Sequence, residues 1–165
     1  MSQQLKIAIG NYQAGYYDAK LTQGIEFQDY ITEKMYKLGW PIVGFSSRKF
    51  QITHGENIMG AEIKNDQRFR QTGNLYIEMQ EKSHPANPNY VNSGILREDN
   101  SILFIIGDTL DFWIMAVRFL RILSECKEPT GSLLYQRVET PTSRGFLFPV
   151  KEADKYCVHK VSTSF

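Results

Sequence analysis

The first strong pattern along the chain is helical. Between residues 24 and 38 apolar side chains recur at three- to four-residue spacing, which is the period of a helix with one buried face. These positions are Phe27, Tyr30 or Ile31, Met35 and Leu38. Gly39 and the Trp40-Pro41 pair follow directly, and a glycine just past the last periodic residue is a common helix stop. The pattern predicts an amphipathic helix over 24–38.

The patterns that follow are those of β-strands. Short strands are expected at residues 49–55, 60–66 and 74–82, and Gly-containing turns separate them. The first two read as a hairpin. Residues 101–107, SILFIIG, form a continuous apolar run typical of a buried central strand, and residues 111–125 read as a strand that passes into a helix.

The remaining segments complete a mixed architecture. Residues 85–92 are rich in Pro and Asn and can only form a loop, whereas residues 145–150 predict a strand and residues 152–156 a short closing helix. A helix, then strands, then mixed elements predict an α/β (α+β) fold in which helices flank a central mixed β-sheet. A chain of this length fits one domain, residues 1–165.

Composition narrows the classes of function. With 19 Lys and Arg against 18 Asp and Glu, the formal charge of +1 gives no argument from overall basicity for nucleic-acid binding, although local clusters are still allowed. Cys126 and Cys157 lack the spacing of a zinc site or a disulfide framework. No basic leader and no long uninterrupted apolar run occurs, so a cytoplasmic protein without a membrane partner is expected.

The stretch GENIMGAEIKND, residues 55–66, is unusual for its density of charge. On a strand Glu62, Lys64 and Asp66 point to one face, whereas Ile63 points to the other face and can anchor the strand in the core. Glu56 stands at the start of the connection, where a turn can return its carboxylate toward Glu62. Either this face is simply solvated, or it holds a metal ion.

A metal site would explain why two carboxylates lie together. Glu56 and Glu62 repel unless something positive sits between them, and a hard divalent cation with oxygen ligands meets that need. Mg²⁺ typically takes one or two protein carboxylates and completes its shell with water and phosphate oxygens. Lys64 then lies where it can position an attacking water or neutralise charge on a phosphate.

These residues carry a resemblance to a known family. Glu56 followed by Glu62-Ile63-Lys64, with a preceding helix that bears Glu26, resembles the acidic-residue, spacer, (Asp/Glu)-x-Lys motif of the PD-(D/E)xK nuclease superfamily. The order of elements from residue 24 to about residue 126, about two-thirds of the chain, is similar to the common core of that superfamily. A Thr-Gly-Asn turn leading into a strand with Ile-Glu is similar to a recurrent phage and restriction-associated form.

The resemblance implies a restriction-endonuclease-like core and a Mg²⁺-dependent deoxyribonuclease, with Mn²⁺ as a substitute. By the resemblance, Glu56 and Glu62 are metal ligands together with the Ile63 carbonyl, and Lys64 orients water or neutralises phosphate. Glu26 matches a helix glutamate that supports a water at the metal, unless it is a solvent-facing residue near a helix start. One departure stands out: the first acidic residue of the superfamily is usually Asp, often after Pro, whereas here Glu56 follows Gly55.

Further residues are candidates for supporting roles. Glu78 on the third strand either reaches the site or pairs with Lys82 or Lys64, and Asp66 is an outer-shell or turn residue. Several cations would rim the site and contact DNA phosphates, unless they are a scatter of solvated charges. These cations are Arg48, Lys49, Arg68, Arg70 and Lys82.

The sequence thus predicts an endonuclease that hydrolyses DNA by water attack and, from the resemblance, leaves a 5′-phosphate. Two alternatives remain open: a non-catalytic DNA-binding or assembly protein that retains the nuclease fold, and a structural protein with a solvated strand face. Cutting both strands at one place would favour a two-fold homodimer.

Overall fold

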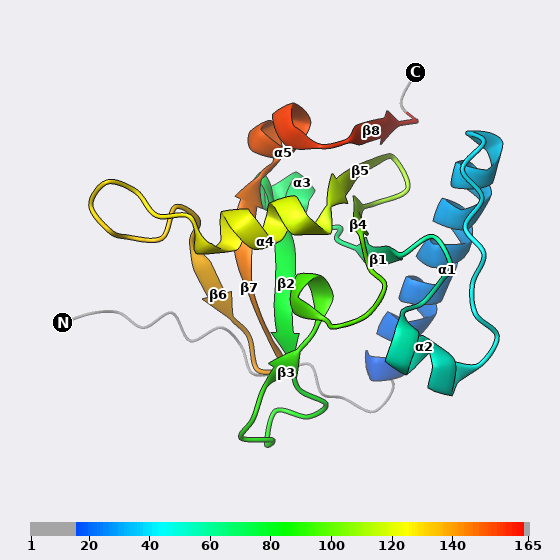
Figure 1. Cartoon of the computed structure of the whole chain (residues 1–165), viewed down its shortest axis with the longest axis horizontal. Helices are drawn as coiled ribbons and strands as arrows, with labels where there is room; N and C mark the ends of the chain where they lie inside the picture. Colours follow the sequence, from blue (N-terminus) through cyan, green and yellow to red (C-terminus); the bar gives the residue numbers. More distant parts are fainter. Residues whose placement is uncertain (1–15, 164–165) are drawn as a thin grey trace.

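The computed structural model describes residues 16–163 and shows a mixed α/β (α+β) fold (Figure 1). The helices in this range are α1 (Tyr16–Lys37), α2 (Arg48–His54), α3 (Phe69–Thr72), α4 (Val117–Glu125) and α5 (Val150–Tyr156), with one 3₁₀ turn, η1 (Gly94–Leu96). The strands are β1 (Ala61–Asn65), β2 (Asn74–Glu81), β3 (Val91–Asn92), β4 (Leu103–Gly107), β5 (Asp111–Ala116), β6 (Arg137–Glu139), β7 (Ser143–Pro149) and β8 (His159–Ser162).

The strands form two sheets rather than the single central sheet that the sequence predicted. The first sheet has the order β1-β4-β5-β8, and the second has the order β3-β2-β7-β6. In the first sheet β1 pairs with β4 in parallel, while β4 with β5 and β5 with β8 are antiparallel. The long apolar run over residues 101–107 therefore lies at the centre of a mixed sheet, as expected for a strand buried on both faces.

Two hydrophobic clusters show how the layers stack. Alternate residues of the first sheet, including Ile63 and Ile105, pack against Phe27 and Ile31 of α1. The opposite face of this sheet packs against β2, β7 and α4, where Trp113 is among the largest buried side chains. The first sheet thus lies between α1 and the second sheet, and this arrangement is visible in Figure 1. Successive side chains of β1, β4 and β5 point to opposite faces of the first sheet, so β4 and β5 each contribute residues to both clusters.

The predicted hairpin of residues 49–55 with residues 60–66 is wrong, because residues 48–54 form helix α2. The Ser47 side chain accepts a hydrogen bond from Phe50 N, which is the contact of a helix N-cap. Phe50 also stacks on His54 one helical turn away. The short alternation of apolar and polar residues in this segment imitates a strand, and local capping decides for the helix.

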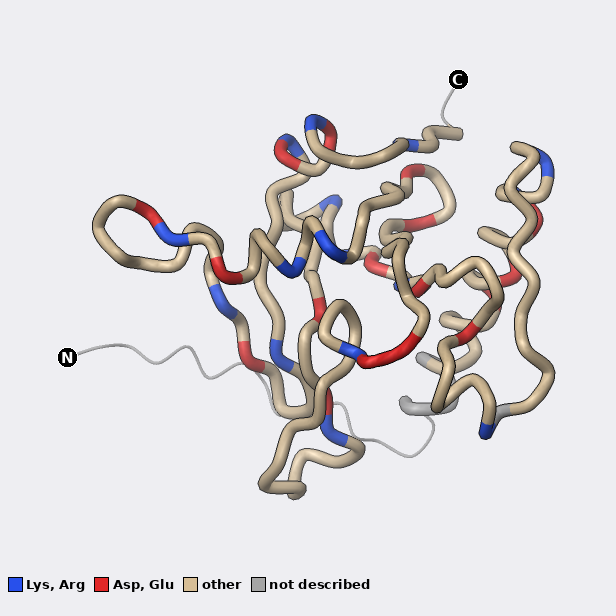
Figure 2. The backbone as a smooth tube through the Cα atoms, viewed as in Figure 1, with Lys and Arg blue, Asp and Glu red and all other residues tan. Residues whose placement is uncertain are grey.

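Most other predicted elements are present. β2, β4, β7 and α5 fall within two residues of their expected positions, and the strand followed by a helix over 111–125 is β5 followed by α4. α1 begins earlier than predicted. Lys and Arg are interspersed with Asp and Glu along the described chain (Figure 2). Among residues 16–163 no helix is long and apolar enough to cross a membrane.

Candidate functional site

Strand β1 separates its side chains as the sequence predicted. Ala61 and Ile63 belong to the cluster packed against α1, so Glu62 and Lys64 point to the opposite side of the sheet. That side is not solvated, because Glu62 is only 1% exposed. The interpretation of a simple wet strand face therefore fails for Glu62. A carboxylate this deeply buried requires compensating positive charge.

Two cations face the Glu62 carboxylate. Lys64 Nζ lies 2.9 Å from Oε1, and Arg97 Nη1 lies 3.9 Å from Oε2. The Oε2 atom is buried and accepts no hydrogen bond from any described residue. Buried polar atoms are nearly always hydrogen-bonded, so a buried carboxylate oxygen without a donor is an unusual feature. It is a position where an additional cation would be stabilised.

Glu56 lies on the loop between α2 and β1, beside Glu62. Its Oε2 accepts a hydrogen bond from Gln28 Nε2 of α1 at 3.3 Å. Burial and then the neighbouring Glu62 carboxylate raise the pKa of Glu56 to about 7. The pKa is raised mainly because the group is buried, and the second carboxylate beside it adds to the effect.

Lys64 connects two strands of different sheets. Its Nζ donates to Glu78 Oε1 of β2 at 3.3 Å, and Ser93 Oγ donates to the same carboxylate oxygen at 3.0 Å. Burial by itself would lower the pKa of Lys64, but the carboxylates of Glu62, Glu78 and Glu56 outweigh it and raise the pKa. Of the two partners that the sequence offered for Glu78, the structure shows Lys64. The Lys64 side chain is still about a third exposed.

The backbone conformation before Glu56 explains why a glycine occupies position 55. Gly55 has φ +102°, and a Cβ there would meet Asn100 Oδ1 at 1.9 Å. Proline, with its φ fixed near about −65°, is excluded from this backbone conformation. The path of the chain out of α2 therefore accounts for a glycine rather than a proline before Glu56.

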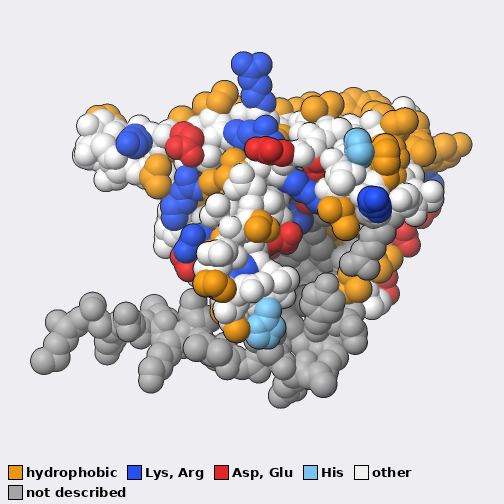
Figure 3. Space-filling model, turned by 60° about the horizontal axis from the view of Figure 1, so that its bottom comes forward, with side chains coloured by type: hydrophobic (Ala, Val, Ile, Leu, Met, Phe, Trp, Pro, Cys, Tyr) orange, Lys and Arg blue, Asp and Glu red, His pale blue; other side chains and the backbone are white. Residues whose placement is uncertain are grey.

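Part of this site borders a cleft of about 1120 Å³, whereas Glu62 itself is buried and is not among the residues that line it. The walls of the cleft come from the first half of α1, the end of β1, β2, the loop before β3 and the turn between β6 and β7. Figure 3 views the molecule from below, where acidic and basic side chains lie at the edge of a hollow. Glu56, Ile63, Lys64 and Glu78 all line this cleft.

Two of the predicted acidic residues have other surroundings. Glu26 is exposed and lines a separate small pocket of about 120 Å³, whereas Gln28 of the same helix contacts Glu56. Asp66 lines the cleft but acts as a turn residue, since it accepts hydrogen bonds from Arg68 N at 2.9 Å and Tyr76 N at 2.8 Å. These contacts tie the end of β1 to β2.

The predicted cationic rim is only partly present. Arg68 and Lys82 line the cleft. Arg70 points elsewhere, because its Nη2 donates to Asp108 at 2.9 Å and to Asp111 at 2.8 Å. Lys49 is exposed on α2 and is not among the residues that line the cleft, and the side chain of Arg48 lies outside the described part of the chain.

Sequence reasoning missed Arg97 and Gln28. Arg97 follows η1 and reaches Glu62 only because the chain folds back beside β1, and no local spacing reports that contact. Gln28 sits one position after a core residue of the amphipathic helix and resembles any polar helix residue. Both depend on tertiary packing.

The donor set can be tested for its fit to a metal ion. Among the described residues, the four carboxyl groups of Glu56, Glu62, Glu78 and Asp99 interact with two cations, Lys64 and Arg97. This excess of negative charge and the free Glu62 Oε2 suit a hard divalent cation. Within residues 16–163, however, no three side chains of the His, Cys, Asp and Glu types are grouped closely enough to hold a metal ion. Glu56 and Glu62 would thus be the protein carboxylates of such a site, completed by main-chain oxygen, water or phosphate.

Comparison of the chain with protein-family models, with curated proteins and with solved structures finds no match.

Proposed function

We propose that the protein is a metal-dependent endonuclease with a restriction-endonuclease-like core that hydrolyses phosphodiester bonds of DNA. The observation that supports this most strongly is the buried Glu62 Oε2, which lacks a hydrogen-bond donor beside a second carboxylate. Maintaining such an arrangement costs folding free energy, and strained electrostatics of this kind concentrate at functional sites. The resemblance of Glu56 and Glu62-Ile63-Lys64 to the PD-(D/E)xK motif agrees with it.

The residues divide into holding and positioning groups. Glu56 and Glu62 would hold Mg²⁺ or Mn²⁺, with the Ile63 carbonyl beside them. The bound cation would supply Lewis-acid polarisation of a phosphate oxygen and lower the pKa of a coordinated water. Lys64, about a third exposed at the cleft, offers a positive charge to the phosphate, and Glu78 keeps its ammonium in place.

The DNA backbone would enter through the cleft. Arg68 and Lys82 are the described cations of the predicted rim that line the cleft, as Lys64 does, and they would contact phosphates of the bound DNA. We place this activity in the cytoplasm, and a two-fold homodimer would suit cleavage of both strands.

One observation favours the non-catalytic alternative, a DNA-binding or assembly protein that retains the nuclease fold. Lys64 already bridges Glu62 and Glu78, so an ion-paired site can stand without a metal ion. The two proposals differ in what they require of Glu62 Oε2, because only the enzyme needs that oxygen to remain free for a cation.

A cleavage assay separates these two functions. Wild-type protein is incubated with supercoiled, linear and branched DNA in Mg²⁺, Mn²⁺ or EDTA, beside Glu62→Gln and the control Glu81→Gln. Glu81 is an exposed residue at the end of β2 that does not line the cleft. The nuclease requires cleavage by wild type and Glu81→Gln in metal only, and none by Glu62→Gln. DNA binding without cleavage in every metal would support the alternative.

A further inference from the structure

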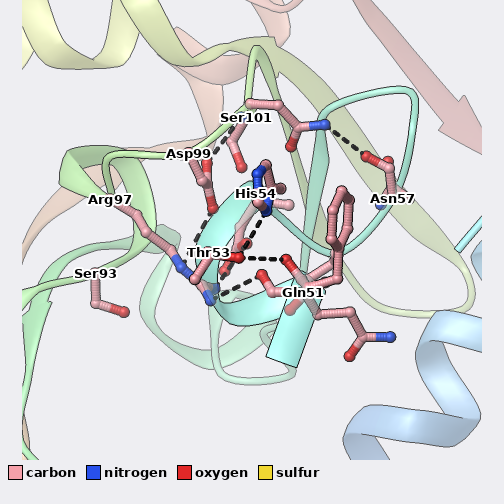
Figure 4. A network of polar contacts seen from close by, with 12 residues as sticks. Gln51, Thr53, His54, Asn57, Ser93, Arg97, Asp99 and Ser101 are labelled. Carbon is pink, nitrogen blue, oxygen red and sulfur yellow. Dashed lines mark hydrogen bonds and ion pairs between the residues drawn. The ribbon is translucent and has the colours of Figure 1, made fainter. Parts of the chain in front are cut away.

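Arg97 presents three different nitrogens to three acceptors. Its Nε forms an ion pair with Asp99 Oδ2 at 3.2 Å that lacks hydrogen-bond geometry. Its Nη2 donates to the Gln51 carbonyl at 3.5 Å, and its Nη1 lies 3.9 Å from Glu62 Oε2. Figure 4 shows Arg97 between Asp99 and Gln51. A guanidinium is planar and rigid, so contacts on two nitrogens determine where the third one lies. The distance from Nη1 to Glu62 is therefore set by Asp99 and Gln51.

Asp99 is firmly anchored. Its side chain is 1% exposed, and its Oδ1 accepts a hydrogen bond from Ser101 N at 2.8 Å. The next residue, Asn100, donates its backbone N–H to the His54 carbonyl at 3.2 Å and its Nδ2 to the Asn57 carbonyl at 2.8 Å. The segment that carries Asp99 is thus fixed to both sides of the loop that bears Glu56.

The backbone of Arg97 is also held. Its carbonyl oxygen accepts a hydrogen bond from Arg121 Nη2 of α4 at 3.0 Å. With the backbone held, the guanidinium can reach Glu62 only by rotating its side chain. Asp99 opposes that rotation by attracting Nε, and the result is a cation close to Glu62 that nevertheless makes no hydrogen bond to Oε2.

We propose that Asp99 is a positioning residue that holds Arg97 back from Glu62 Oε2 and so keeps this oxygen open to a divalent cation. The inference rests on the proposed function, since it gives that cation a place beside Glu62. Without the negative charge of Asp99, Arg97 is no longer attracted away from Glu62 and moves onto Oε2, where a charge-assisted hydrogen bond replaces the 3.9 Å contact. Arg97 then competes with the metal ion for one oxygen.

A double-mutant cycle measures this competition without DNA or turnover. Mn²⁺ binding is determined by calorimetry for wild type, Asp99→Asn, Arg97→Gln and the double variant. Asp99→Asn should weaken Mn²⁺ binding roughly tenfold, the contribution of one hydrogen bond to a charged group. Arg97→Gln should bind at least as tightly as wild type, because a competing positive charge has been removed. The double variant should match Arg97→Gln.

The cycle excludes two simpler explanations. If Asp99 acted only through its negative charge, Asp99→Asn would weaken binding equally in both backgrounds. If Asp99 served only to support the fold, the double variant would bind as weakly as Asp99→Asn. The control Asp154→Asn removes a carboxylate that bonds Trp113 Nε1, away from the cleft, and should leave Mn²⁺ affinity unchanged.

The results distinguish a failure of the proposed function from a failure of this inference. Wild type that binds no Mn²⁺ contradicts the proposed function itself. If wild type binds Mn²⁺ and Asp99→Asn binds it equally well, only this inference is contradicted. The same holds if the effects of the two substitutions simply add in the double variant. Should Asp99→Asn fail to fold, Arg97→Gln decides, because weaker Mn²⁺ binding by that variant also overturns the inference.

Discussion

Lys64 Nζ lies 2.9 Å from Oε1 of the buried Glu62, its neighbour on the same face of β1. The same ammonium reaches Glu78 on β2 of the other sheet. A single cation therefore joins the two sheets at the floor of the cleft and compensates the carboxylate that the fold buries. Its remaining exposure leaves it available to a substrate phosphate.

Replacing Lys64 should separate catalysis from folding. Lys64→Ala should lower the single-turnover rate of DNA cleavage by about 10²–10³, the usual effect of removing one group that stabilises a transition state. The free energy of unfolding should fall by roughly 1–2 kcal/mol, between the limits for surface and buried ion pairs. Quenched-flow cleavage and chemical unfolding of the same samples test both. A rate within threefold of wild type would remove Lys64 from the chemistry.

The raised pKa of Glu56 predicts a pH-dependent stability. Since its folded-state pKa of about 7 lies above the ordinary value of 4.5, the folded protein binds this proton more tightly than the unfolded chain does. Stability in EDTA should therefore decrease as pH rises from 4.5 to 7, by on the order of 2 kcal/mol for a group that still reaches the cleft. The pKa values of Asp108 and Asp111 are lowered, so their contribution is lost only at more acidic pH.

Thermal melts of wild type and Glu56→Gln at several pH values isolate that contribution. The variant should show a flatter dependence between pH 5 and 7, because its amide does not titrate. Parallel curves for the two proteins would mean that Glu56 is not held protonated by its surroundings.

Salt dependence tests which cations contact DNA. Arg68→Ala and Lys82→Ala should each weaken DNA binding for all sequences and reduce the slope of log K against log salt by about one unit. Arg70→Ala is the matched control, because its guanidinium already binds Asp108 and Asp111, and its slope should equal that of wild type. Fluorescence anisotropy in Ca²⁺ buffer provides the measurement. A flattened slope for Arg70→Ala alone would place the DNA outside the cleft.

Replacement of two glycines by alanine should change the stability of the protein in opposite directions. Gly55→Ala should cost about 2–4 kcal/mol, since its backbone conformation strains an L residue and the added methyl meets Asn100. Gly24→Ala, within α1 and with open space around it, should raise stability by about 0.5–1 kcal/mol. Urea unfolding in EDTA compares them. A Gly55→Ala protein as stable as wild type would contradict the described path of the Glu56 loop.

The sequence predicted those features that local pattern determines. Apolar spacing placed α1, β4 and β5, and alternation on β1 put Glu62 and Lys64 on the face opposite Ile63. Pattern did not reveal that this face packs against a second sheet, because burial of a charged face depends on its partner. For the same reason the sequence indicated a solvated or metal-binding surface but not a buried carboxylate.

Other differences also come from tertiary contacts. Residues 48–54 alternate like a strand, yet the Ser47 cap and the Phe50–His54 contact favour a helix. Glu26 was selected by its place in a motif, whereas the path of α1 brings Gln28 to Glu56. Arg70 appeared suited to phosphate, and only the fold places Asp108 and Asp111 beside it.

Anomalous diffraction from a crystal soaked in Mn²⁺ would test the central claim most directly, because it locates the cation itself. The account predicts one anomalous peak between Glu56 and Glu62, about 2.0–2.6 Å from Glu62 Oε2. The peak should be absent from Glu62→Gln crystals grown and soaked in the same way. An ordered wild-type cleft without Mn²⁺, in a protein that still cleaves DNA in that metal, would contradict the assignment of Glu62 as the metal-binding residue.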